Sequence, residues 1–131
     1  VYLAPQTERC IFISPGRLYF LPVAHGEGKV VAKDTSTLEA LKSGGYIAFK
    51  YVDKNGQEGP YPINPNGSVN SIAGLTDATG RVLGLMPHPE RFVRPTQHPQ
   101  WSRLKHELMK RDATDGMIIF ENAVKFIQEN F

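Results

Sequence analysis

Apolar residues along this chain gather in short runs that Pro, Gly and Asn interrupt, a pattern typical of strands joined by tight turns. The run at 46–52 is the clearest, because most of its residues are aromatic or β-branched and no breaker falls within it. We expect further strands at 10–13, 18–21, 72–75 and 81–86.

Turn signals lie between these runs. Asp53–Gly56 predicts a tight turn, and Asp77–Gly80 predicts a hairpin turn between the last two strands. Residues 56–70 are dense in Pro, Gly and Asn, so we expect a long structured loop there. Loops of that length tend to be functional.

Helical spacing is confined to three places. A capping-box pattern at Ser36–Glu39 predicts a short helix over 37–43, which a glycine pair ends. A mostly polar helix is expected at 100–110. Asp115 is the expected N-cap of the last helix, in which five apolar residues recur at helical spacing and should pack on the sheet: Phe120, Ala123, Val124, Ile127 and Phe131. This pattern indicates an α/β or α+β domain and does not choose between them.

Bulk composition limits the kind of protein this can be. The chain has 131 residues, 40% hydrophobic and 21% charged, which suits one soluble domain with a core. The net charge is only +2, without a basic stripe or a membrane-length apolar run, so we expect no nucleic acid or membrane partner. The single cysteine, Cys10, excludes a disulfide framework and favours a cytoplasmic location. The absence of an initial Met suggests a processed chain or a fragment.

Candidate chemistry lies at the end of the apolar run 82–86, which should be a buried strand. His88 and Glu90 follow it, each directly after a proline. Prolines favour extended backbone at the residue before them, and residues i and i+2 of extended backbone point to the same side. A carboxylate beside an imidazole fixes the tautomer that a general base needs. The pair therefore forms two members of a catalytic triad, or else simply ends a strand with a capping His and a solvated Glu.

A metal site at this stretch is disfavoured. Zinc nucleobase deaminases also contain His-x-Glu, but they need a Pro-Cys-x-x-Cys segment that this sequence lacks. His25, Glu27, His88 and Glu90 could in principle share a metal, although no ligand-spacing rule supports this. We therefore expect no metal.

Two loops and one thiol complete the candidates. In His25-Gly26-Glu27-Gly28 the glycines permit close backbone approach, so a ligand-binding loop and a plain turn are equally open. Asn64-Pro65-Asn66-Gly67-Ser68 is typical of a surface turn and could also make contacts. Cys10 lacks the flanking glycines of a nucleophile elbow and is expected to be a buried strand residue.

Three motifs together resemble one family. Pro22–Gly28, Asn64–Ser68 and Met86–Arg91 are similar to segments of the class I glutamine amidotransferase component of phosphoribosylformylglycinamidine (FGAM) synthase, from purine biosynthesis. The resemblance runs from Cys10 to the last helix, and residues 93–112 look like an insertion.

The resemblance implies a flavodoxin-like α/β domain and a ligase that takes its amido nitrogen from glutamine. A cysteine attacks glutamine, and ammonia passes to a synthetase subunit or domain, where ATP and Mg²⁺ serve the activation of formylglycinamide ribonucleotide (FGAR). By resemblance, His88 is the general base and acid, Glu90 orients it, and the loop of His25, Gly26 and Glu27 lines the glutamine pocket. The chain itself would hold no cofactor. Four further residues would face the synthetase or be structural: Asn64, Asn66, Ser68 and Arg91.

The sequence departs from the family in one respect. The family's nucleophile lies in an upstream G-x-C-x-G elbow, and this sequence contains no such motif. We therefore predict that residues 1–131 are the C-terminal half of one amidotransferase domain, without the half that holds the elbow and the oxyanion hole, and that the chain alone is inactive. Two alternatives stay open: a pseudo-amidotransferase module that only binds, and a γ-glutamyl hydrolase. The parent could be a separate subunit or the last domain of a longer polypeptide.

Overall fold

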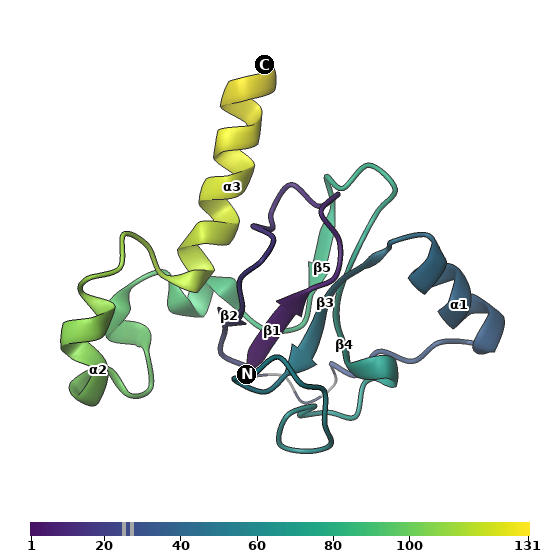
Figure 1. Cartoon of the computed structure of the whole chain (residues 1–131), viewed down its shortest axis with the longest axis horizontal. Coiled ribbons are helices and arrows are strands. Elements are labelled where there is room, and N and C mark those ends of the chain that lie inside the picture. Colours follow the sequence, from purple (N-terminus) through teal and green to yellow (C-terminus); the bar gives the residue numbers. More distant parts are fainter. Residues whose placement is uncertain (25, 27) are drawn as a thin grey trace.

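Five strands form one sheet in the order β2-β1-β3-β4-β5 in the computed structural model, which describes residues 1–24, 26 and 28–131. All strand pairs in this described part are antiparallel. In Figure 1, α1 lies on one side of the sheet and α2 and α3 on the other, so the chain is an α/β structure. The elements in chain order are β1 (Tyr2–Pro5), β2 (Tyr19–Phe20), α1 (Thr35–Ser43), β3 (Ile47–Val52), η1 (Val69–Ser71), β4 (Ile72–Thr76), β5 (Leu83–Leu85), η2 (Pro89–Phe92), η3 (Pro95–Gln97), α2 (Trp101–Leu108) and α3 (Asp115–Asn130).

The central strand β3 confirms the clearest sequence prediction. It pairs with β1 on one edge and β4 on the other, and every residue except Lys50 is buried. A strand that is buried on both faces reads as a near-continuous apolar run. Phe49 packs edge to face on Tyr19 of β2, with ring centroids 5.2 Å apart.

The strand expected at 10–13 is not formed. Tyr2–Pro5 instead fills the place between β2 and β3 as strand β1. Cys10 is buried, as expected, at 1% exposure, but it lies in an irregular segment. Its neighbour Ile11 donates its backbone N–H to Gly80 at 2.9 Å. The apolar run therefore enters the core from a loop, because core burial does not require strand pairing.

The hairpin of β4 and β5 forms as predicted, with Asp77–Gly80 as its turn. The Asp77 carboxylate accepts four hydrogen bonds from the turn, including one from the Thr79 hydroxyl at 2.6 Å. That bond is the largest cause of a carboxyl pKa lowered to about 2. The run at 82–86 is less buried than expected: Val82 is 62% exposed, because it lies beside β5, one of the two edge strands of the described sheet.

Helix starts differ slightly from the predictions. The first helix begins earlier than expected, at Thr35, because Asp34 is its N-cap and accepts the Thr37 N–H at 2.7 Å. The last helix has Thr114 as its N-cap, one residue before the predicted cap. None of the helices in the described part of the chain is both long and apolar enough to span a bilayer.

The predicted packing of the last helix is wrong along most of its length. Phe120, Val124, Ile127 and Phe131 are 43%, 54%, 56% and 89% exposed, and α3 projects away from the sheet (Figure 1). In its first turns, Ile119, at 3% exposure, belongs to the core cluster, and the partly buried Ile118 packs against that cluster. Helical spacing of apolar residues predicts which side of a helix can be covered, but it does not identify the segment that covers that side.

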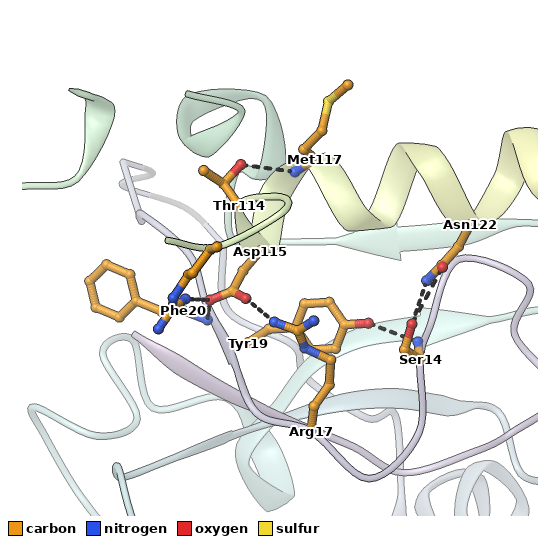
Figure 2. Close-up of polar contacts among 9 residues, drawn as sticks. Ser14, Arg17, Tyr19, Phe20, Thr114, Asp115, Met117 and Asn122 are labelled. Carbon is orange, nitrogen blue, oxygen red and sulfur yellow. Dashed lines mark hydrogen bonds and ion pairs between the residues drawn. The ribbon is translucent and has the colours of Figure 1, made fainter. Parts of the chain in front are cut away.

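The first turn of α3 is nevertheless firmly attached. The buried Asp115 carboxylate forms an ion pair with Arg17 and accepts the backbone N–H of Phe20 at 3.0 Å (Figure 2). Further along α3, Asn122 donates to Phe12 at 3.1 Å and to the Ser14 hydroxyl at 3.0 Å. These polar contacts join the helix to the N-terminal segment of the chain.

Candidate functional site

His88 and Glu90 meet at the end of β5. Nδ1 of His88 lies 2.7 Å from Oε1 of Glu90, a hydrogen-bond distance. His88 has extended backbone, with φ −103° and ψ 95°, as the following proline predicts. Glu90 is not extended, because the chain turns directly into η2. The side chains are therefore brought together by a 3₁₀ turn and not by a straight strand.

The carboxylate of this pair is held in its charged form. Its own backbone N–H is the largest cause that lowers the Glu90 pKa, and the hydrogen bond and charge of His88 lower it further. An Nδ1–H donated to a carboxylate leaves the basic lone pair of the imidazole on Nε2. The side chains are 31% and 59% exposed, so the pair is open to a reactant. The arrangement can accept and return a proton.

The backbone beneath the pair is fixed from two sides. The His88 N–H donates to the Pro22 carbonyl at 2.9 Å, and the carbonyl of His88 accepts the Arg91 N–H at 3.2 Å. Pro87 is fully buried. Arg91 itself is exposed on η2. The base is thus placed by buried backbone while its ring remains accessible.

The first turn of α3 presses directly on the turn that carries Glu90. A Cβ added to Gly116 would lie 2.1 Å from the Pro89 carbonyl oxygen and 2.5 Å from that of Phe92. Only glycine permits this approach of two backbones. No local sequence pattern predicts the role of Gly116, since its partners lie 24 or more residues earlier.

The loop expected to bind glutamine is only partly described. His25 and Glu27 lie outside the described residues. Gly26 is exposed, and a Cβ there would meet nothing within 4 Å.

The segment Asn64–Ser68 is more than a surface turn. Ser68 is 3% exposed, and its hydroxyl accepts the Val30 N–H at 3.0 Å. Asn66 donates through Nδ2 to the Gly28 carbonyl at 2.7 Å. These bonds span 38 residues of sequence, so no local pattern could have predicted them.

The surroundings of the pair limit the chemistry that can be assigned to it. Within the described residues, no group of three or more His, Cys, Asp or Glu side chains is placed to hold a metal ion. A cavity of about 780 Å³ lies between β2, α2 and α3. Its lining includes Arg17, His98 and Arg111 and contains neither member of the His88–Glu90 pair.

Comparison with known proteins identifies the family. Residues 1–127 match the CobB/CobQ-like glutamine amidotransferase domain. The protein named phosphoribosylformylglycinamidine synthase subunit PurQ from Dehalococcoides mccartyi is 45% identical over 130 residues, covering 98% of this chain and 48% of that protein. The protein of the same name from Archaeoglobus fulgidus is 39% identical over 133 residues, covering 97% of this chain and 45% of that protein.

A solved structure agrees. The structure of PurLQS from Thermotoga maritima includes a chain that matches with a TM-score of 0.62 at 25% identity, covering 97% of this chain and 46% of that one. The present chain spans about half the length of the curated relatives described above. By sequence match and by fold, it belongs to the CobB/CobQ-like glutamine amidotransferase domain family.

Proposed function

We propose that this chain is the C-terminal part of the glutamine amidotransferase component of FGAM synthase. The parent enzyme hydrolyses glutamine and supplies ammonia for the ATP-dependent conversion of FGAR to FGAM in de novo purine biosynthesis. The observation that supports this most is the His88–Glu90 contact of 2.7 Å in a chain that is 45% identical to a protein named PurQ.

The chemistry assigned to the pair is proton transfer. His88 accepts the proton of a cysteine thiol as the sulfur attacks the side-chain carbonyl carbon of glutamine. It then gives that proton to the departing nitrogen, which leaves as ammonia, and a thioester remains. Water, deprotonated by the same imidazole, hydrolyses the thioester to glutamate and restores the thiol. Glu90 orients the ring and stabilises its charged form.

The attacking cysteine has to come from elsewhere in the parent protein. Cys10 is the only cysteine of this sequence, and it is 1% exposed within the core cluster. We infer that the other half of the relatives' length supplies the nucleophile elbow and the oxyanion hole, and completes a flavodoxin-like domain. The exposed apolar side of α3 suits a helix that such a half would cover. The chain by itself is then inactive.

The remaining assignments follow the family. Gly26, with His25 and Glu27, lines the glutamine pocket, and Arg91 faces the synthetase. The synthetase subunit or domain holds ATP and Mg²⁺, whereas this chain binds no cofactor. The assembly works in the cytoplasm.

The test separates the two sources of nitrogen. In the full-length protein with its synthetase, His88→Ala should lower glutamine-dependent amidation of FGAR by about 10²-fold or more. Ammonia-dependent amidation should stay near the wild-type rate, because only the ammonia source is lost. His106→Ala, on the exposed face of α2, is the matched control and should change neither activity.

Two results would contradict the proposal. Loss of both activities in a folded His88→Ala protein would remove the assigned role of the imidazole. Glutamine hydrolysis that never yields FGAM, whatever synthetase and ATP are present, would favour a γ-glutamyl hydrolase.

A further inference from the structure

The segment that contains the proposed glutamine loop is bonded to the base at its near end. The Pro22 carbonyl accepts the backbone N–H of His88 at 2.9 Å. The start of the loop segment, at Pro22, is therefore bonded directly to His88, the proposed proton-transfer residue.

The far end is held by the Asn64–Ser68 turn. The Gly28 carbonyl accepts the Asn66 side-chain N–H at 2.7 Å, and the Val30 N–H donates to the Ser68 hydroxyl at 3.0 Å. The Val30 carbonyl accepts the Val69 N–H at 2.9 Å. Three bonds therefore fix two residues just beyond the loop, and Gly28 is buried.

The turn that makes these bonds is itself rigid. Asn64 accepts the Ser68 N–H at 3.1 Å and donates to the Ser68 carbonyl at 2.9 Å. The Ser68 hydroxyl donates to Oδ1 of Asn66 at 2.9 Å while it accepts from Val30. Each polar group of Ser68 is thus used, as expected for a side chain that is 3% exposed.

We propose that Asn66 and Ser68 are positioning residues for glutamine binding, and this inference rests on the proposed function. They fix Gly28 and Val30 while His88 fixes Pro22, so the described residues on both sides of the proposed glutamine loop are held in place relative to the base. Removal of the Asn66 side chain leaves the carbonyl of the buried Gly28 without this partner, and removal of the Ser68 hydroxyl leaves the Val30 N–H without its acceptor. The far end of the 22–30 segment is then held less firmly. Substrate affinity should suffer, whereas proton transfer should not, because the His88–Glu90 contact is held by η2.

The experiment uses the full-length protein with its synthetase and measures KM and kcat for glutamine. Asn66→Asp keeps the size and the acceptor oxygen but has no N–H to donate to Gly28. We expect it to raise KM for glutamine roughly tenfold, the size of effect that an unsatisfied buried carbonyl produces. Its kcat and its ammonia-dependent activity should stay within about twofold of wild type. Asn66→Ala should act in the same direction.

Serine variants test the second bond. Ser68→Ala should raise KM for glutamine and speed hydrogen exchange at the Val30 amide, which loses its acceptor. Ser68→Thr keeps the hydroxyl and should recover much of the affinity. Asn122→Ala is the matched control: it deletes an amide with two comparable bonds, to Phe12 and Ser14, in another part of the molecule, and KM should not change.

Several results would overturn the inference. KM within about twofold of wild type in folded Asn66→Asp protein would do so, as would an equal rise in KM for Asn122→Ala. A fall in kcat at constant KM would do so too, since it would place Asn66 in the chemical step. Failure of the proposed function has a different signature: wild-type protein would show no glutamine-dependent amidation, or His88→Ala would retain it.

Discussion

Gly116 should be intolerant of even a single methyl group. In Gly116→Ala the new Cβ would lie 2.1 Å from the Pro89 carbonyl oxygen and 2.5 Å from that of Phe92. Ordinary van der Waals contact begins at 3.4 Å. Since both contacting atoms are backbone, α3 and η2 have to separate by about 1 Å.

The cost can be worked from these contacts. Overpacking typically costs about 1–3 kcal/mol, and rigid backbone on both sides places this case near 3. Alanine returns up to about 1 kcal/mol through its better helix propensity, so the net loss is about 2 kcal/mol. For a domain of 150–250 residues this lowers Tm by about 4–8 °C. Because η2 carries Glu90, a 1 Å displacement should also lower kcat for glutamine, by up to about 10²-fold.

Thermal melts and glutamine kinetics of the full-length protein, measured well below Tm, test both effects. Gly84→Ala is the control, because its Cβ would come no closer than 3.9 Å to its nearest neighbour, the Leu75 carbonyl. An unchanged Tm for Gly116→Ala would refute the close approach of α3 and η2. A lowered Tm with unchanged kcat would confirm the packing and refute its link to Glu90.

Three other changes give separable results. Asp115→Asn removes the charge that pairs with Arg17. Because the arginine is 36% exposed, we expect the free energy of unfolding in urea to fall by about 1–3 kcal/mol, less than for a fully buried pair. An unchanged urea midpoint would contradict this. Asp77→Asn should destabilise the protein at pH 6. The stability difference between variant and wild type should vanish as pH falls from about 4 toward 2, because the folded-state pKa of Asp77 is lowered to about 2 and the carboxylate contributes stability only while ionised. A stability difference that persists at pH 2 would exclude the carboxylate as its cause. Glu90→Gln should lower kcat for glutamine roughly 10- to 100-fold by removing the charge beside the imidazole, with ammonia-dependent synthesis as the internal control; equal loss of both activities would instead indicate misfolding.

Local features of this fold could be predicted from the sequence. The central strand β3 and the hairpin around Asp77–Gly80 form as predicted, because residue type and spacing within ten or so residues decide them. The contact of His88 with Glu90 was predicted for the same reason, although a 3₁₀ turn produces it. This part of the site could be predicted because its two residues are close in sequence.

Contacts between distant segments could not be predicted in this way. Tyr2–Pro5 pairs with both β2 and β3 as a strand, whereas the more apolar run at 10–13 forms no strand in the described structure. The bond from Asn66 to Gly28 depends on how two loops lie together. The apolar side of α3 had the right period, but period does not identify what covers it.

The bond from Asp115 to Phe20 also sets an order in time. Its two ends lie 95 residues apart, so at a synthesis rate of about 5–20 residues per second roughly 5–20 s separate their exit from the ribosome. Throughout that interval the Phe20 N–H lacks its Asp115 acceptor, and most of the sheet leaves the ribosome before Asp115 does. The bond that attaches the helix therefore forms late, after the segment that it joins has left the ribosome. Its exposed apolar stripe follows β1 to β5 along the chain, so these strands leave the ribosome before the stripe does.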